Sequence, residues 1–155
     1  MLQVTAGAYF TVCVTEGGAV FAFGSNNRGQ LGLGDTEDRL VPTLLRGELE
    51  NKSVLQAAAG SVHTTFVTAD GSVFAFGHNH YGQLGVGDEE NRLVPTLLRG
   101  DLENKSVLQV AAGAMHTIFV TADGLVFSCG SNSKGQLGVG DTENRLVPTL
   151  VTGQL

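Results

Sequence analysis

Short apolar runs alternate with glycine-rich polar segments along the whole chain. Four runs in the last third have the length and composition of β-strands: residues 107–113, 116–122, 125–128 and 146–151. Asp123-Gly124, between the second and third runs, is a typical hairpin turn. Helical periodicity never lasts more than a couple of turns, and the chain contains 22 glycines. The pattern therefore predicts an all-β fold and disfavours helical repeat arrays.

This pattern recurs every 53 residues without an insertion or deletion, as the spacing of Pro42, Pro95 and Pro148 shows. The second and third copies are identical at 35 of their 49 shared positions, which indicates recent duplication or design. A repeat of this length with four short strands predicts one blade of a β-propeller per copy. We expect a single repeat domain, residues 1–155, built from repeats 1–53, 54–106 and 107–155.

Two predicted strands are apolar on both faces. Residues 20–23 and 73–76 both read Val-Phe-Ala-Phe. A sheet with one solvated face alternates apolar and polar positions instead. Blades that stack face to face around an axis bury both faces, so we expect both segments to be buried on both sides.

Two motifs recur with the period. The segment 110–120 carries Gly113 and, three residues later, His116 amid apolar residues; the second copy carries Gly60 and His63, with Thr65 at a normally apolar place. The first copy has Phe10 instead of the histidine. Each copy then continues with a glycine, an asparagine and the sequence GQLGxGD.

These motifs closely resemble those of the regulator of chromosome condensation repeat family, over essentially the whole chain. Kelch repeats have a similar period, but they normally carry a double glycine and a tryptophan in every blade. Here Gly17-Gly18 occurs once and tryptophan is absent. The kelch alternative is therefore disfavoured.

The resemblance implies a broad range of functions, because members of the family act as nucleotide exchange factors, ubiquitin-ligase domains and light sensors. The founding member's exchange activity relies on a wedge between strands, for which no copy here has extra residues. The plant light receptors of the family use clusters of tryptophan, a residue that this chain lacks. We expect a non-catalytic scaffold for protein–protein interaction. The alternatives are an exchange factor for a small GTPase, or a duplicated or designed propeller fragment with no native partner.

No residue pattern predicts a catalytic, metal or cofactor site. His63 and His116, with Gly60 and Gly113, recur in their blades, and a recurring group usually fixes the blade. Repeated acidic loops, such as the one from Asp35, lack calcium-loop spacing and fit solvated turns with local ion pairs. The two cysteines occupy phenylalanine positions of the other copies, so we expect buried free thiols at Cys13 and Cys129.

The sharpest divergence between the copies lies in one loop. A recurring framework builds the scaffold, whereas divergent exposed residues are free to meet a partner. Tyrosine and arginine are favoured in interfaces, and a basic and aromatic patch suits an acidic or phosphorylated protein segment. Neutral drift of an exposed loop is the alternative. The candidate binding residues are Ser25, Asn27, Arg28, His78, His80, Tyr81, Ser131, Ser133 and Lys134.

Charge and hydropathy limit the choice of partners. The net charge is −6, and the nine lysines and arginines are scattered, so we expect no nucleic-acid partner. Residues 4–14 are uncharged but too short to span a bilayer, and the chain lacks a basic signal start. We therefore expect no membrane partner and a cytoplasmic or nuclear location.

Three blades cannot close a propeller ring, which usually has about four to eight. Leu155 aligns with Leu102 and Met1 with Val54, so a head-to-tail junction between two chains would lack only the equivalents of residues 103–106. We expect a homodimer that completes a six-bladed ring and covers the edge strands. A longer, seven-bladed protein is the competing possibility.

Overall fold

The computed structural model describes residues 3–153. Each repeat forms one four-stranded antiparallel sheet, which we call a blade. Blade one contains β1 (Gln3–Ala6), β2 (Phe10–Val14), β3 (Val20–Gly24) and β4 (Arg39–Leu44). Blade two contains β5 (Val54–Ala59), β6 (His63–Thr68), β7 (Val73–Gly77) and β8 (Arg92–Leu97). Blade three contains β9 (Val107–Ala112), β10 (His116–Thr121), β11 (Val126–Gly130) and β12 (Arg145–Leu150).

The predicted all-β fold and its four strands per repeat are confirmed. The largest difference in the last repeat is that β11 continues to Gly130, beyond the predicted end at Ser128. A short 3-10 helix, η1 (Gly100–Leu102), lies between β8 and β9. No helix among residues 3–153 is long and apolar enough to cross a membrane.

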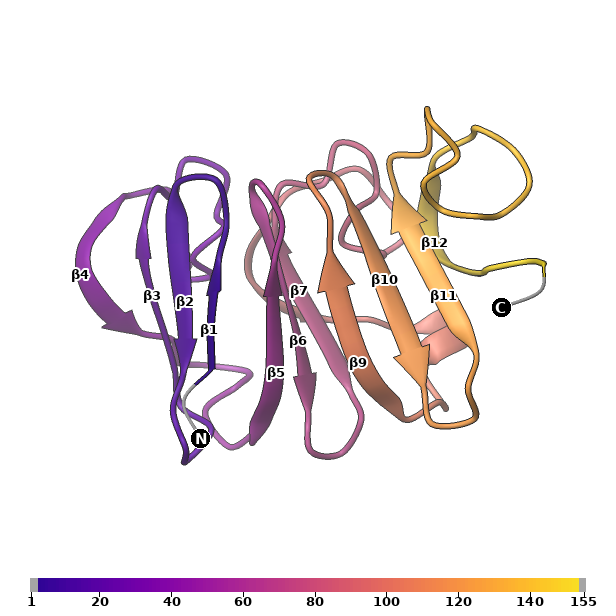
Figure 1. The fold of residues 1–155 in the computed structure, drawn as a ribbon. Coiled ribbons are helices and arrows are strands. Elements are labelled where there is room, and N and C mark those ends of the chain that lie inside the picture. Colours follow the sequence, from indigo (N-terminus) through magenta and orange to yellow (C-terminus); the bar gives the residue numbers. More distant parts are fainter. Residues whose placement is uncertain (1–2, 154–155) are drawn as a thin grey trace.

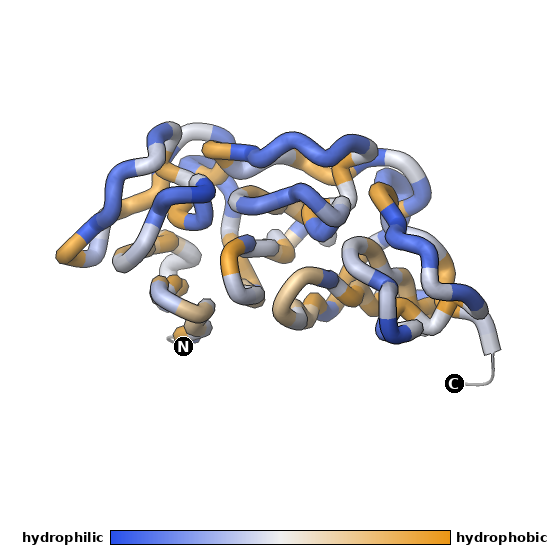
Figure 2. The backbone as a smooth tube through the Cα atoms, turned by 90° about the horizontal axis from the view of Figure 1, so that it is seen from above, coloured by the Kyte–Doolittle hydropathy of each residue, from blue (hydrophilic) through white to orange (hydrophobic). Residues whose placement is uncertain are grey.

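The three blades stand side by side in chain order, with β1, β5 and β9 as their adjacent first strands (Figure 1). Seen from above, they fan outward from these strands toward the outermost β4, β8 and β12 (Figure 2). This is the arrangement expected of consecutive propeller blades. All three loops between the third and fourth strands leave the same end of the blades, which is uppermost in Figure 1.

A glycine ends the third strand of every blade because a side chain would not fit there. Gly24, Gly77 and Gly130 have φ values of 108°, 103° and 104°, a region that other residues rarely adopt. A Cβ at Gly24 would also lie 2.5 Å from the Tyr9 carbonyl oxygen. The register shifts just before these glycines, and the chain turns there into the long loop.

Each blade has two faces. We call the face toward the preceding blade the front, marked in β6 by Thr64, Phe66 and Thr68, and the opposite face the rear, marked by His63 and Val67. All six residues of β6 are buried, because blade two has a neighbour on each side. In β2 only the rear residues are buried, and in β10 only the front residues are buried. The outer faces of blades one and three are therefore half open.

This asymmetry corrects two expectations. Residues 73–76 are buried on both faces, as predicted, but in the equivalent strand β3 only Val20 and Ala22 are buried. Cys129 is a buried free thiol on the front of blade three, as predicted. Cys13 is only half-buried, because it lies on the front of blade one, where the described chain has no preceding blade.

Two apolar cores hold the blades together. The first joins the rear of blade one, including Val12 and Ala22, to the front of blade two, including Phe66 and Phe76. The second joins the rear of blade two to the front of blade three, and it includes Val67, Phe119 and Cys129. The buried apolar cores thus lie between neighbouring blades rather than within one sheet.

Candidate binding face

The loop after the third strand is held by an asparagine buried in every blade. Asn26 Oδ1 accepts a hydrogen bond from the Leu31 amide at 2.9 Å, and its Nδ2 donates to the Asp35 carbonyl oxygen at 2.9 Å. Asn79 and Asn132 make the same bonds in their blades. All three are 0% exposed. The asparagine side chain therefore links two separate parts of the loop through hydrogen bonds.

A glutamine of the GQLG motif then fixes the divergent residue. Gln30 Oε1 accepts a hydrogen bond from the Arg28 amide at 2.8 Å. Gln83 binds the Tyr81 amide at 3.0 Å, and Gln136 binds the Lys134 amide at 2.9 Å. Each blade therefore presents a different side chain from the same hydrogen-bonded turn.

Three of the candidate residues form an aromatic cluster on the loop of blade two. The ring centroids of His80 and Tyr81 lie 5.4 Å apart, and those of His78 and His80 lie 6.1 Å apart. Gln83 Nε2 lies 2.8 Å from His78 Nδ1, which suits an amide N–H donating to an unprotonated ring nitrogen. His78 is thus tethered by the same glutamine that holds the Tyr81 amide.

Arg28, from blade one, lies close enough to affect this cluster. The pKa of His78 is lowered by desolvation first, and then by the positive charges of Arg28 and His80. Both Arg28 and Tyr81 are exposed. Arg28 thus adds a positive charge near the three clustered aromatic rings of blade two.

The remaining candidates have smaller roles. Asn27 Oδ1 and Ser131 Oγ accept weak hydrogen bonds of 3.4 Å from the glutamines of their own loops. Ser133 and Lys134 are exposed on the loop of blade three, and Ser25 is half-buried. Lys134 belongs to the next loop along and makes no ring contact with the cluster in the described structure.

An aspartate in each of the repeated acidic loops forms an ion pair with an arginine of the same loop. Asp35, Asp88 and Asp141 each contact an arginine four residues later at 2.6 Å. The hydrogen bond from Arg39 lowers the pKa of Asp35, helped by the Glu37 amide. Among residues 3–153 no group of three or more acidic, histidine or cysteine side chains is placed to hold a metal ion. These three carboxylates are therefore committed to arginines of their own loops.

The recurring histidines pack over the recurring glycines. A Cβ at Gly60 would lie 2.2 Å from His63 Cε1, and one at Gly113 would lie 2.0 Å from His116 Cε1. The three-residue spacing thus places the ring in the space that a Cβ of the glycine would occupy. Phe10 lies over Gly7 in the same way. His63 is fully buried, and burial, followed by the charges of His116 and His78, lowers its pKa to about 3. A neutral buried ring of this kind is a packing element.

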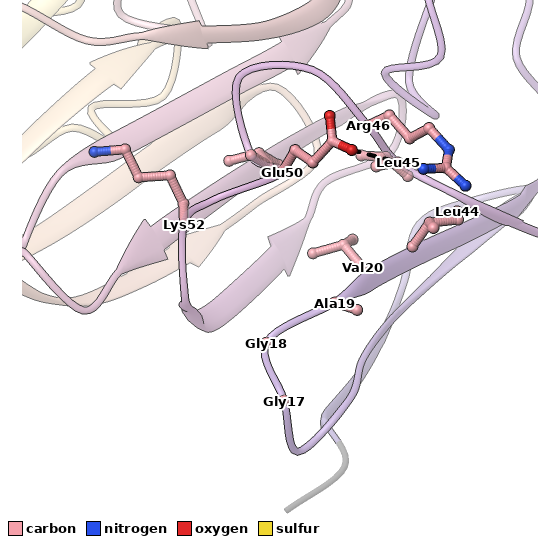
Figure 3. A pocket seen from close by; sticks show the side chains of 10 residues that line it. Gly17, Gly18, Ala19, Val20, Leu44, Leu45, Arg46, Glu50 and Lys52 are labelled. Carbon is pink, nitrogen blue, oxygen red and sulfur yellow. Dashed lines mark ion pairs between the residues drawn. The ribbon is translucent and has the colours of Figure 1, made fainter.

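A pocket of about 240 Å³ lies at the opposite end of blade one, between the β2–β3 turn and the segment after β4. Figure 3 shows Val20 and Leu44 on its wall and the Arg46–Glu50 ion pair, 3.7 Å long, beside it. The same positions line a pocket in blade two, from Val73 and Leu97 to Glu103. Because it recurs with the repeat, we attribute it to the blade architecture rather than to a dedicated ligand.

The family model described as "Regulator of chromosome condensation (RCC1) repeat" matches residues 17–67, 70–120 and 123–154. A second model with the same description matches residues 2–30, 54–83 and 107–136. The chain belongs to the RCC1 repeat family. The first model spans the blade boundaries and the second begins with the first strand of each blade, so both reproduce the 53-residue period.

Similar proteins include much longer chains. The Ultraviolet-B receptor UVR8 of Arabidopsis thaliana is 42% identical over 94% of this chain, which covers 33% of that receptor. The probable E3 ubiquitin-protein ligase HERC4 of Mus musculus is 40% identical over 98% of this chain and 14% of its own length. The crystal structure of Prp20p from Saccharomyces cerevisiae has a TM-score of 0.86 at 24% identity, covering 97% of this chain and 38% of that one. This chain thus shares the fold of Prp20p and spans a third or less of the first two relatives.

Sequence reasoning missed the buried asparagines and the glutamines as the residues that position the binding loops. Both recur three times beside the glycines, and that recurrence was the available signal. The glycines of the GQLG segment predict a turn, but they do not reveal which side chains hold it.

Proposed function

We propose that this RCC1 repeat chain is a non-catalytic protein-binding scaffold, and that its loop end binds an acidic or phosphorylated protein segment. The observation that supports this most strongly is the shared turn: invariant asparagine and glutamine side chains hold three equivalent backbones while the displayed residues differ. In a structure this repetitive, the loop end is where the blades acquire distinct chemistry. The β-propeller itself supports many functions, so the site must carry the proposal.

The chemistry of the loop end suggests the class of partner. Arg28 offers a planar guanidinium suited to carboxylate or phosphate. Tyr81 and His80 add flat surfaces that contribute contact area with little loss of conformational entropy. Lys134 adds a second positive charge one blade further on. The chain as a whole carries a net charge of −6, so the attraction for a negatively charged segment would come from these local positive charges.

For the assembly we propose a homodimer in which two chains form a six-bladed ring. The half-open front of blade one and rear of blade three support it, because both carry apolar residues that are buried at the equivalent places inside the chain. In such a ring the loop ends of six blades would share one face. The scaffold would then present two copies of the patch.

Nucleotide exchange on a small GTPase is the alternative. Prp20p has binding properties toward Gsp1p and histones, but those belong to that protein, of which this chain covers 38%. Loading a panel of small GTPases with a fluorescent nucleotide would test the alternative directly. Accelerated nucleotide release in the presence of this chain would favour exchange over simple binding.

The binding proposal is tested with a fluorescent glutamate-rich peptide, its glutamine counterpart and a phosphoserine version, by anisotropy at low and at physiological salt. We expect the two negatively charged peptides to bind more tightly, and alanine replacement of Arg28, Tyr81 and Lys134 together to weaken binding about tenfold or more. The matched control is Arg46→Ala combined with Arg99→Ala, which also removes two positive charges, but from the other end of the blades. Equal losses in both variants would place the site elsewhere.

A further inference from the structure

We propose that His78 sets the selectivity of the loop end for anions: its ring takes up a proton from solvent when a negatively charged segment binds, and exchanges its hydrogen bond with Gln83 for one with the ligand. This deepens the binding function proposed above and rests on it. Both residues belong to the loop of blade two, the blade that contacts a neighbouring blade on each side.

The hydrogen bond to the Tyr81 amide fixes the orientation of the Gln83 side chain. A backbone N–H can only donate, so the Gln83 atom 3.0 Å from it is the oxygen, Oε1. The amide nitrogen, Nε2, therefore points the other way and lies 2.8 Å from His78 Nδ1. Because this nitrogen can only donate, Nδ1 of the histidine is unprotonated and its Nε2 carries the ring proton. His78 is thus held as one defined neutral tautomer.

A second proton on His78 is incompatible with this arrangement. An imidazolium has no acceptor, so it cannot receive the N–H of Gln83 in any orientation of the ring. If the Gln83 amide flipped, its oxygen could accept from the imidazolium, but its nitrogen would then face the Tyr81 amide, donor against donor. Either response leaves a donor without its acceptor at a glutamine that is 0% exposed. The unliganded loop therefore favours the neutral ring.

The groups that face His78 act in the same direction. Desolvation lowers its pKa most, followed by the positive charges of Arg28 on the loop of blade one and of His80 on its own loop. His63 on β6 also interacts with it but is fully buried and neutral, and Tyr81 contributes an aromatic ring 6.3 Å away. An anion placed among these groups would offset the positive charge, which favours the protonated ring.

The other two loops use acceptors that do not titrate. Gln30 Nε2 donates to Asn27 Oδ1 at 3.4 Å. Gln136 Nε2 donates to the hydroxyl of Ser131, which occupies the position of His78, also at 3.4 Å. Amide and hydroxyl oxygens do not change charge between about pH 5 and 8, whereas histidine does. His78 therefore gives the loop of blade two a proton-coupled contact that the described loops of blades one and three lack.

Proton uptake would also change what the loop displays. Once separated from Gln83, the imidazolium would offer N–H donors near Arg28, and both cations suit the oxygens of a carboxylate or phosphate. Gln83 Nε2 would keep the Met115 sulfur, 3.5 Å away, as a weak partner. A neutral segment gives the imidazolium no compensating charge, so it would leave the loop in its closed, unprotonated form. The exchange therefore favours anions over neutral ligands.

Isothermal titration calorimetry with the glutamate-rich peptide tests this coupling. Affinities are compared between about pH 5.5 and 7.5, where glutamate side chains stay ionised. The phosphoserine peptide is left out because its own second pKa, about 6, lies in this range. The affinity should rise roughly tenfold on acidification, since uptake of one proton changes it by at most about tenfold per pH unit. Titrations in two buffers of different ionisation enthalpy count the protons taken up.

Two histidine variants separate His78 from the general effect of acidification. His78→Ser copies Ser131, which still accepts from its glutamine, so the loop should stay closed while proton uptake is lost. His116→Phe copies Phe10 and removes a half-buried histidine outside the site. This control should keep the pH dependence of the wild-type chain.

Binding that strengthens with acid in the wild-type chain and in His116→Phe, but not in His78→Ser, supports the proposal. Binding without proton uptake, or uptake that persists in His78→Ser, overturns it and leaves the binding function intact. No binding at any pH removes both. Without peptide, ¹⁵N spectra of the histidine rings should show His78 protonated at Nε2 and not at Nδ1 at neutral pH, and the opposite tautomer would overturn the proposal independently of binding.

Discussion

His63 on β6 and Thr117 on β10 meet across the boundary between two blades, with Nε2 of the histidine 2.9 Å from the threonine hydroxyl oxygen and both residues fully buried. The Thr117 hydroxyl in turn lies 2.7 Å from the Gln83 carbonyl oxygen, to which it donates. His63 therefore donates from Nε2 as a neutral ring. Its Nδ1 has no partner in the described structure. In this chain the repeat-motif histidine of blade two, His63, thus forms a hydrogen bond to the next blade.

The neutral state of His63 predicts a pH dependence of stability. Its pKa is about 3 in the folded chain but about 6.5 when unfolded. The unfolded state therefore binds an extra proton below about pH 6.5, and stability falls by roughly 1.4 kcal/mol per pH unit from there toward pH 3. His63→Phe should flatten this slope, since Phe10 fills the equivalent place in blade one. Urea melts at several pH values test it, and an unchanged slope in the variant would contradict the assignment.

Thr65 predicts a stabilising substitution. Its hydroxyl is buried without a hydrogen-bond partner among the described residues, and its counterpart in blade one is Val12, which is 0% exposed. Thr65→Val should raise the free energy of unfolding by about 1 kcal/mol. Thr64→Val is the control, because the Thr64 hydroxyl donates to the Gln30 carbonyl oxygen at 2.9 Å. Denaturant midpoints should move in opposite directions, and a destabilised Thr65→Val would show that the hydroxyl has a partner.

The glycine beneath each histidine predicts a strong steric effect. Gly60→Ala would place a Cβ 2.2 Å from the His63 ring, so the ring must move out of the blade interface. We expect a loss of roughly 1–3 kcal/mol, as for other overpacked cores. Gly17→Ala is the control, since no atom beyond its two chain neighbours lies within 4 Å of its Cβ position. If both variants melted alike, the ring would not be held in this place.

The two thiols should react at different rates. Cys129 is 0% exposed, and burial raises the pKa of its thiol. Cys13 is half-buried on the open front of blade one. A thiol reagent at low protein concentration should label Cys13 first and Cys129 only after unfolding. Mass spectrometry of each peptide over time measures this, and rapid labelling of Cys129 in the native chain would contradict its place in the core.

The sequence was sufficient to predict the blades, because the period, the strand lengths and the turn glycines are local signals. It also placed Cys129 correctly, since the counterpart Phe76 reports the same position within a blade. The same reasoning was wrong for Cys13. Periodic equivalence identifies a position within a blade, but it does not show whether another blade covers that face.

The candidate binding residues were recognisable as divergent, but their grouping was not. The positive charge of Arg28 acts on His78 only because blade two packs against blade one, and no spacing within one repeat encodes that proximity. The tether between Gln83 and His78 likewise depends on how the loop closes around Asn79. The loop end can be found from divergence, whereas its geometry follows from blade packing.

Chemical-shift mapping would locate a negatively charged peptide on the proposed loop end of this scaffold. The ¹⁵N-labelled chain is titrated with the glutamate-rich peptide, and the perturbed backbone amides are assigned. We expect saturable shifts at Arg28, His80 and Tyr81, with the amides of Arg46 and Arg99 at the opposite end unchanged. Shifts confined to the opposite end, or none at saturating peptide, would contradict it.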